Sequence, residues 1–282
     1  MMSFNGQMLS YASRLKRAAR RFFKSGQKKP VHTPNRLPNL SYNDDPTLDR
    51  FIFICGLHRS GTTLLELLLS AKYDVSYLRS SVPESEGQHM QSVYRAANHF
   101  GGSGRFAFSN EMRAELDALS SDPEDCRARI VSDWSRFVVG SSRTLLEKSP
   151  PNLTKIFWLR QTFPGCRFVI ITRDPRAVSA ATQKWANLPL AELMRHWDAA
   201  YTQAMTDYKA ADCIMVRYED LCRAPEEEIG RVADFLELAT RDGSGHVEER
   251  HKELVNSNAK YIEMHGGANY GTGIRHDLGY DI

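Results

Sequence analysis

The stretch that decides the fold reads Phe51-Ile52-Phe53-Ile54-Cys55-Gly56-Leu57-His58-Arg59-Ser60-Gly61-Thr62-Thr63. Its first five residues form a continuous apolar run, which is typical of a strand buried on both faces of a parallel sheet. A short loop bounded by Gly56 and Gly61 follows, and a leucine-rich stretch then predicts a helix. This order predicts a phosphate site, because loop N–H groups and the helix dipole both attract an anion.

The loop has the spacing of a Walker A motif, GxxxxGK[ST], except that Thr62 stands in the lysine position. A nucleotide triphosphatase uses that lysine to neutralise the β and γ phosphates. Here Arg59 offers a cation earlier in the loop instead. The loop therefore suits a 5′-phosphosulfate better than a triphosphate. The alternative, a glycine turn that merely joins strand to helix, is disfavoured by the strand, the spacing, the hydroxyl pair and the arginine together.

Strands and helices alternate along the rest of the chain. Apolar runs predict further strands at residues 144–147, 167–172 and 213–216. Helical patterns cover residues 62–71, 86–99, 124–138, 152–163, 175–185, 190–208 and 225–236. The alternation predicts an α/β, P-loop-containing three-layer fold with a central, mostly parallel sheet flanked by helices. We expect this domain to span residues 50–282.

Residues 1–49 differ from the rest of the chain. Apolar residues recur at helical spacing over 8–23 among arginines and lysines, which predicts a basic amphipathic helix, and four prolines between 26 and 49 predict a linker. Residues 8–25 could make a peripheral membrane contact or bind an acidic partner; the alternative is a helix docked on its own domain or a frayed terminus.

Composition bounds the remaining possibilities. With 41% hydrophobic residues the chain is an ordinary globular protein, and a net charge of +3 is too small to indicate nucleic-acid binding. Five cysteines without a CxxC pair favour a reducing setting, so we expect a cytoplasmic protein, membrane-associated at most through residues 8–25. No run approaches the roughly 20 apolar residues that span a bilayer.

A second anchor follows the predicted strand at 167–172. Arg173 stands at the carboxyl end of this strand, where ligands bind in open α/β sheets, and an arginine there can bind a phosphate through two hydrogen bonds. The alternative is that Arg173 and Arg176 are surface charges paired with Asp174. Lys148 likewise ends a strand, where the alternative is an ordinary solvated lysine.

These motifs occur in the order Arg59-Ser60-Gly61-Thr62-Thr63, then Arg173, then Tyr218-Glu219-Asp220-Leu221. In this order the chain resembles the sulfotransferases that use 3′-phosphoadenosine 5′-phosphosulfate (PAPS). Leu64 stands where the cytosolic branch has a tryptophan, so the chain is more similar to the bacterial and tyrosylprotein-type branch. The resemblance extends to about Leu238.

The resemblance implies roles for individual residues. The loop residues Arg59, Ser60, Gly61, Thr62 and Thr63 would bind the 5′ side of PAPS. Arg173 would bind the 3′-phosphate, Tyr218 would contact the adenine side, and Lys148 would lie beside the transferred group.

One position departs from the family pattern. The family serine eight positions after the arginine is Ala181 here, so Ser179 or Thr182 would supply that hydroxyl, or it is absent. The glycines between 266 and 273, with Arg275, resemble the family's late loop over the 3′-phosphate only weakly, and a flexible tail is the alternative.

Sulfuryl transfer needs a base for the acceptor proton and cations for the charge on the transferred group. Arg59 and Lys148 would supply the cations, and we expect no metal ion. Glu84, Glu86 and His89 all qualify as the base, with Glu84 the preferred choice, although each could be a solvated residue.

The sequence thus predicts a sulfotransferase that moves a sulfuryl group from PAPS to a hydroxyl acceptor by in-line transfer. The acceptor, which could be a small molecule, a glycan, a lipid or a peptide, and the oligomeric state stay open. The alternatives are a P-loop kinase-like enzyme and a non-catalytic nucleotide-binding scaffold.

Overall fold

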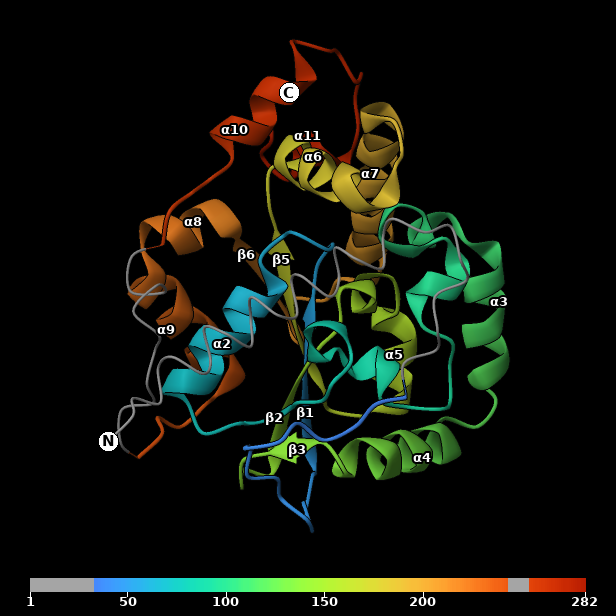
Figure 1. Ribbon diagram of the computed structural model, residues 1–282, viewed down its shortest axis with the longest axis vertical. Coiled ribbons are helices and arrows are strands. Elements are labelled where there is room, and N and C mark those ends of the chain that lie inside the picture. Colours follow the sequence, from blue (N-terminus) through green and yellow to red (C-terminus); the bar gives the residue numbers. More distant parts are fainter. Residues whose placement is uncertain (1–32, 243–253) are drawn as a thin grey trace. The chain divides into compact units, whose positions relative to one another are not determined.

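The computed structural model describes residues 33–242 and 254–282 (Figure 1). The chain divides into two units, Met1–Thr33 and Pro34–Ile282, and the following description concerns the second. The amphipathic helix predicted over residues 8–23 and the first part of the predicted linker lie outside the described residues. In the part that is described, no helix has the length and apolar character needed to cross a membrane.

A six-stranded sheet forms the centre of the unit (Figure 1). Its strands are β1 (Arg50–Cys55), β2 (Ser76–Leu78), β3 (Val138–Val139), β4 (Thr144–Lys148), β5 (Arg167–Thr172) and β6 (Cys213–Arg217). They lie in the order β3-β2-β4-β1-β5-β6, and every neighbouring pair is parallel except β2 with β3. The predicted mostly parallel sheet is confirmed. The sequence did not predict β2 and β3, because strands of three and two residues are too short to show a pattern.

The apolar run of β1 reflects burial on both faces. Phe51, Phe53 and Cys55 belong to one core cluster, whereas Ile52 and Ile54 belong to the other. Because successive side chains of a strand point to opposite faces, a central strand must be apolar at every position.

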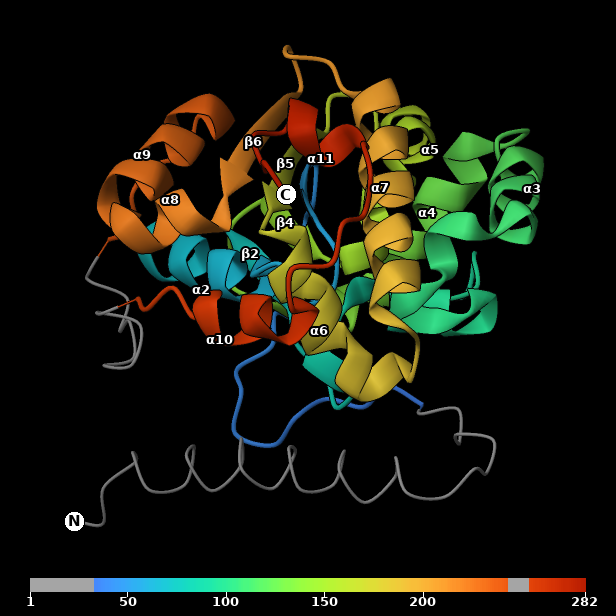
Figure 2. The same cartoon turned by 90° about the horizontal axis from the view of Figure 1, so that it is seen from above.

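Helices cover both faces, as the three-layer prediction requires (Figures 1 and 2). One face carries α2 (Thr62–Lys72), α8 (Tyr218–Arg223) and α9 (Pro225–Leu236). The other carries α3 (Asn110–Leu119), α4 (Pro123–Ser135), α5 (Ile156–Thr162) and α7 (Leu190–Asp207). The three-layer α/β fold is confirmed.

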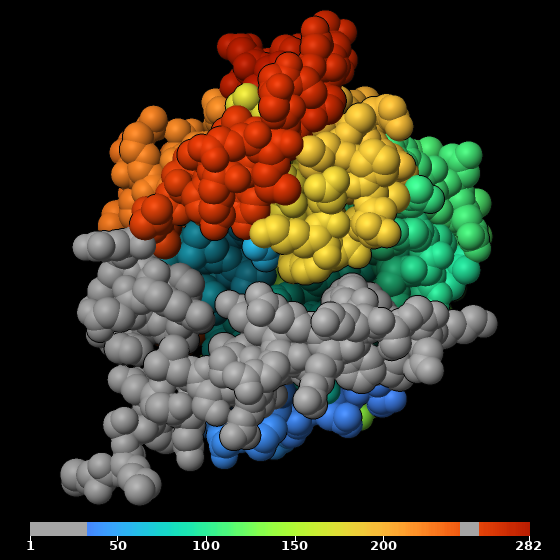
Figure 3. Space-filling model, turned by 45° about the horizontal axis from the view of Figure 1, so that its top comes forward, coloured from blue at the N-terminus to red at the C-terminus, as the bar shows by residue number. Residues whose placement is uncertain are grey.

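The C-terminal residues lie over the edge of the sheet where the parallel strands end. There α6 (Pro175–Ala186) packs between α7 and the short helix α10 (Ala259–Ile262), and α11 (Ile274–Asp277) contacts α7. In the space-filling view the C-terminal segment, in red, lies directly beside the yellow surface of α6 and α7 (Figure 3). A segment remote in sequence therefore borders this edge.

The helix predicted over residues 86–99 is wrong. Three 3₁₀ turns occupy Pro83–Ser85, Gly87–His89 and Ala97–Phe100, with irregular backbone between the last two. Glutamine side chains take the N–H groups that a helix would use. The Gln91 Oε1 atom accepts from the backbone N–H groups of Val93 (2.6 Å) and Tyr94 (3.0 Å), and Gln88 Oε1 accepts from that of Ala97 (3.0 Å).

Part of the predicted linker is attached to the folded unit. The backbone N–H of Asn43 donates to the carbonyl of Val138 (2.9 Å), and the Arg36 Nε donates to the carbonyl of Arg136 (2.7 Å). Residues 34–49 therefore run along the sheet near β3.

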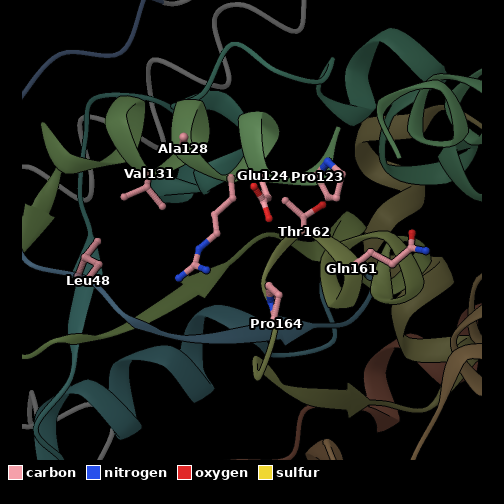
Figure 4. A pocket seen from close by; sticks show the side chains of 9 residues that line it. Leu48, Pro123, Glu124, Ala128, Val131, Gln161, Thr162 and Pro164 are labelled. Atoms are coloured by element: carbon pink, nitrogen blue, oxygen red, sulfur yellow. The ribbon is translucent and has the colours of Figure 1, made fainter. Parts of the chain in front are cut away.

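A pocket of about 470 Å³ lies near the edge of the sheet where the strands begin (Figure 4). Its lining includes Leu48, which precedes β1, Pro164, which precedes β5, and residues of α4 such as Val131. The predicted site residues follow the strands instead, so this pocket is separate from them.

Candidate active site

The predicted site residues follow strands that end at one edge of the sheet. Parallel pairing sets Ile54 beside Lys148 and Thr172 beside Arg217. The loop that leaves β1, Lys148 at the end of β4 and Arg173 after β5 therefore share this edge. Open α/β sheets bind ligands there.

The phosphate loop, residues 56–63, is shaped by a glycine in the left-handed region and by close packing. Gly61 precedes α2 with a φ of 104°, in the left-handed region that favours glycine, and a Cβ there would come 2.8 Å from the ring of Tyr218. Ser60 is buried, and its backbone N–H donates to the carbonyl of Leu57 (3.0 Å). Thr62 is buried, whereas Thr63 is partly exposed. The loop is thus fixed in one conformation against Tyr218.

Arg173 joins the two predicted anchors. Its side chain is only 6% exposed, and Nη1 donates to the carbonyl of Arg59 (2.9 Å) in the phosphate loop. The Nε atom donates to Asn258 Oδ1 (2.8 Å) and Nη2 to Ser257 Oγ (3.3 Å). The guanidinium carbon lies 4.2 Å from the centre of the Tyr218 ring. The strand tips near Arg59 and Arg173 therefore converge.

Among the described residues no carboxylate hydrogen-bonds directly to Arg173, and Glu219 acts on it through Asn258. Arg173 is not a surface charge paired with Asp174, because Asp174 instead caps α6 and pairs with Arg176 (2.8 Å). The hydrogen-bond partners of Arg173 among the described residues are all neutral groups. Burial lowers the pKa of Arg173 from its ordinary value, so an anion at this place would be strongly favoured.

Glu219 binds Asn258, which in turn binds Arg173, and it also binds two further groups nearby. Its Oε1 accepts from Asn258 Nδ2 (2.6 Å) and from the backbone N–H of Asp174 (2.9 Å), and its Oε2 accepts from the Tyr280 hydroxyl (3.2 Å). Sequence reasoning placed Glu219 only within a motif and missed Asn258 and Tyr280. No local pattern could have found them, because Asn258 lies 85 positions from Arg173.

The family serine position, Ala181, and the candidate hydroxyl of Ser179 lie in different surroundings. Ala181 packs in an apolar cluster with Ala177, Ala180 and Tyr261. Ser179 lies about 200° away around the helix axis. Its hydroxyl is buried without a hydrogen-bond partner among the described residues. Such an orphaned group suits a ligand oxygen.

The late glycine segment uses its arginine internally. Arg275 is buried and pairs with Asp198, and it also donates to the carbonyls of Tyr270 and Gly271. It is therefore not available to a phosphate in this arrangement. From the C-terminal segment, Ser257 and Asn258 reach Arg173 instead.

The two cations that the sequence predicts for catalysis differ in exposure and in their contacts. Arg59 is exposed, and its guanidinium carbon lies 4.9 Å from the centre of the Trp185 ring at the end of α6. Lys148 is 2% exposed, and its Nζ donates to the carbonyl of Glu84 (2.7 Å). Burial and the Lys148 charge lower the pKa of His58 to about 4, so this imidazole is neutral beside the lysine.

The three candidate bases lie close together but in different environments. Glu84 is exposed, and its carbonyl rather than its carboxylate meets Lys148. Glu86 is buried, and its Oε2 accepts from Gln88 Nε2 (2.5 Å) and lies 3.8 Å from His89 Nε2. Burial lowers the pKa of His89, so its imidazole is neutral near pH 7. Glu86 and His89 are therefore neighbours, here named the Glu86–His89 pair, although 3.8 Å is too long for a hydrogen bond and a neutral imidazole forms no ion pair.

Within residues 33–242 and 254–282, no three His, Cys, Asp or Glu side chains form a group that could hold a metal ion. The expectation of metal-free catalysis stays a prediction.

A family model described as "Sulfotransferase family" matches residues 51–242, about two thirds of the chain. The chain belongs to the sulfotransferase family. The predicted family is thus confirmed, and the kinase-like alternative gains no support. The matched region holds this sulfotransferase's phosphate loop, Lys148 and Arg173, whereas Ser257 and Asn258 lie beyond it.

Relatives of this sulfotransferase include tyrosylprotein enzymes. Protein-tyrosine sulfotransferase A of Caenorhabditis elegans is 26% identical over 213 residues, which cover 71% of this chain and 53% of that protein. Protein-tyrosine sulfotransferase 1 of Danio rerio is 28% identical over 223 residues, which cover 74% and 58%. This sulfotransferase therefore spans about half the length of the curated relatives it matches.

A solved structure is similar in fold. The sulfotransferase domain from the Synechococcus PCC 7002 olefin synthase has a TM-score of 0.50 and 17% identity to this sulfotransferase. The match covers 86% of this chain and 99% of that domain. At this identity the likeness supports the fold alone.

Proposed function

We propose that this sulfotransferase moves a sulfuryl group from PAPS to a hydroxyl acceptor. One observation carries the proposal: two buried cations at one sheet edge, Arg173 and Lys148, hydrogen-bond only to neutral groups among the described residues. A buried charge without a directly bonded opposite charge is costly, so the edge is suited to receive anionic groups. A donor with phosphate groups at both ends of one adenosine supplies them.

Each part of the donor then has a proposed partner. Arg173 would bind the 3′-phosphate, with the unpartnered hydroxyl of Ser179 as a second contact. The backbone N–H groups of residues 61–63 at the start of α2 would bind the 5′ side, since the Ser60 N–H already donates to the Leu57 carbonyl. Tyr218, which packs on Gly61 and under Arg173, would contact the adenosine.

PAPS supplies an activated sulfuryl group. The acceptor oxygen attacks the sulfur, the bond from sulfur to the 5′-phosphate oxygen breaks, and 3′-phosphoadenosine 5′-phosphate (PAP) leaves. Lys148 would stabilise the negative charge that develops on the oxygens around the sulfur. The acceptor proton would pass to the Glu86–His89 pair, because Glu84, the preferred base from sequence, exposes its carboxylate to water.

The acceptor proposal takes its first candidate from the relatives. Because two of them are named protein-tyrosine sulfotransferases, tyrosine peptides head the panel of acceptors to be tested with labelled PAPS. Small aromatic and aliphatic alcohols complete the panel. The cytoplasmic setting and a membrane contact through residues 8–25 are further proposals from sequence alone, and co-sedimentation with anionic and neutral vesicles tests the contact.

The donor assignment is tested by calorimetry with PAP and with AMP, which lacks the 3′-phosphate. We expect Arg173→Ala to weaken PAP binding about 100-fold, the loss of roughly 3 kcal/mol from charge-assisted hydrogen bonds, and to change AMP binding far less. Arg176→Ala is the matched control, because Arg176 is paired with Asp174. Absence of PAP binding at millimolar concentration removes the proposal, and equal losses for PAP and AMP place the 3′-phosphate elsewhere.

A further inference from the structure

A buried carboxylate connects β4 to the irregular segment at residues 83–97. Glu147 precedes Lys148 and is 1% exposed. Its Oε1 accepts from the backbone N–H of Gly87 (3.0 Å) and from the Ser149 hydroxyl (2.6 Å), and its Oε2 accepts from Asn152 Nδ2 (2.5 Å). All three partners donate, which is the arrangement that an ionised carboxylate requires.

The contact at Gly87 is too close for any other residue. A Cβ at this position would lie 2.4 Å from Glu147 Oε1 and 2.8 Å from its Cγ. Gly87 also bonds through its carbonyl, because Trp134 Nε1 donates to it (3.0 Å). Glycine at 87 therefore permits the carboxylate to reach the backbone directly after Glu86.

Glu147 and Lys148, the last two residues of β4, and Ser149, which follows them, each bind a backbone group of the irregular segment. The Glu147 carboxylate binds Gly87, the Lys148 ammonium binds the Glu84 carbonyl, and the Ser149 hydroxyl accepts from the backbone N–H of Gln88 (3.0 Å). The segment has no regular backbone ladder of its own between residues 90 and 96. These side-chain bonds fix its position instead.

A buried cation accompanies the carboxylate. Lys155 is 1% exposed, and its Nζ has no hydrogen-bond partner among the described residues. Burial lowers the pKa of Lys155 to about 8, and the Glu147 charge is the largest influence in the opposite direction. The Nζ atom lies 4.1 Å from the centre of the Tyr94 ring, which belongs to the same segment. Burial raises the pKa of Glu147, and the hydrogen bonds from Ser149 and Asn152, with the charges of Lys148 and Lys155, act against that rise.

We propose that Glu147 is a positioning residue of this sulfotransferase, whose buried carboxylate holds Gly87 so that the Glu86–His89 pair faces the site beside Lys148. This inference rests on the proposed function. Glu147 does not touch the reacting atoms; it acts through the backbone of the neighbouring base. Donor binding, which depends on Arg173 and the phosphate loop, should not depend on it.

The test uses Gly87→Ala, Glu147→Asp and the double variant, with kcat measured by labelled PAPS and PAP affinity by calorimetry. We expect Gly87→Ala to lower kcat about 100-fold, because its Cβ pushes the segment off the carboxylate, while PAP affinity stays within about twofold. Glu147→Asp should lower kcat about tenfold. In the double variant the shorter side chain makes room for the Cβ, so the losses should be clearly less than multiplicative.

Asp212→Asn is the matched control. Asp212 is a carboxylate bonded to Arg160 (2.5 Å), and it directly precedes β6, so it lies where the strands begin and away from the site. This substitution should lower the melting temperature without lowering kcat. If Gly87→Ala does not fold, Glu147→Asp alone carries the test. An unchanged kcat, a loss of PAP affinity as large as the loss of kcat, or multiplicative losses overturn the role of Glu147 alone. A wild-type chain that binds no PAP overturns the proposed function and this role with it.

Discussion

Arg173 and Glu86 lie at the same edge of the sheet, but the chain positions them by different means. Arg173 directly follows β5, and the phosphate loop and the C-terminal segment enclose its side chain. Glu86 lies in irregular backbone that side chains from β4 and α4 hold in place. A regular strand thus positions Arg173 on the donor-binding side of the site, whereas individual side-chain hydrogen bonds position Glu86 on the side of the proposed base.

This difference has an energetic consequence. Each side-chain hydrogen bond contributes roughly 1 kcal/mol, and segments without a backbone ladder open locally more easily than strands. Substitutions around Glu86 should therefore change turnover, and those around Arg173 should change donor affinity. The following predictions test that separation, from the largest expected effect to the smallest.

Removing the proposed base should have the largest effect. We expect Glu86→Gln and His89→Ala to lower kcat by about 10²- to 10⁴-fold, the usual contribution of a general base, with PAP affinity unchanged. Glu84→Gln should cost only a few-fold, because its carboxylate is exposed. Single-turnover rates with labelled PAPS measure this. A larger loss for Glu84→Gln than for the other two would restore Glu84 as the base.

Lys148→Met tests the residue that binds the base segment through the Glu84 carbonyl and would contact the transferred group of the donor. Loss of its charge should lower kcat about 10²- to 10³-fold, because the developing negative charge loses its buried cation. Lys72→Met is the control, since Lys72 forms an exposed ion pair with Glu226. If both variants keep wild-type turnover, Lys148 has no part in the chemistry.

The pH profile of kcat reports on the Glu86–His89 pair. Because burial lowers the pKa of His89, the imidazole stays neutral below the ordinary histidine value of about 6.5. We expect kcat to be flat through pH 7 and to fall about tenfold per pH unit only below the lowered pKa. An acid limb at or above pH 6.5 that persists in His89→Ala contradicts this assignment.

Acid should destabilise the fold through His196. Its buried Nε2 accepts from the backbone N–H of Ala107 (3.2 Å), and burial lowers its pKa to about 3. Between pH 6.5 and 3 the unfolded chain binds a proton that the folded chain does not, so the free energy of unfolding falls as pH falls, by up to about 1.4 kcal/mol per pH unit.

Urea unfolding at pH 7 and pH 5 measures the effect of His196. The difference between the two pH values should shrink in His196→Phe and should not shrink in His99→Phe, because His99 is exposed. Equal differences in wild type and His196→Phe would show that another group causes the acid sensitivity.

The smallest expected effect concerns Trp134. Trp134→Phe keeps an aromatic ring beside Phe163 but removes the hydrogen bond to the Gly87 carbonyl. We expect a loss of about 1–2 kcal/mol in the free energy of unfolding and a decrease in kcat of a few-fold, with PAP affinity unchanged. A change in PAP affinity larger than the change in kcat would contradict the prediction that the base segment affects turnover and not donor binding.

The donor side could be predicted from sequence because its signals are local. A buried strand, the loop ending in Thr62 and Thr63, and an arginine directly after another strand are each contiguous. The 83–97 segment gave a false helix, because Gln88 and Gln91 look like neutral helix residues although their side chains bind the backbone. Glu147 gave no signal, since a glutamate in a strand does not reveal its partner.

The sequence by itself determined where the strands end, and therefore that the phosphate loop, Lys148 and Arg173 share one edge, because parallel strands end together. Only the tertiary structure decided which charges lack a directly bonded opposite charge and which residues bind them. Asn258 meets Arg173 across 85 positions and Gly87 meets Glu147 across 60. Packing of the whole chain creates such contacts, so no local pattern of residues can encode them.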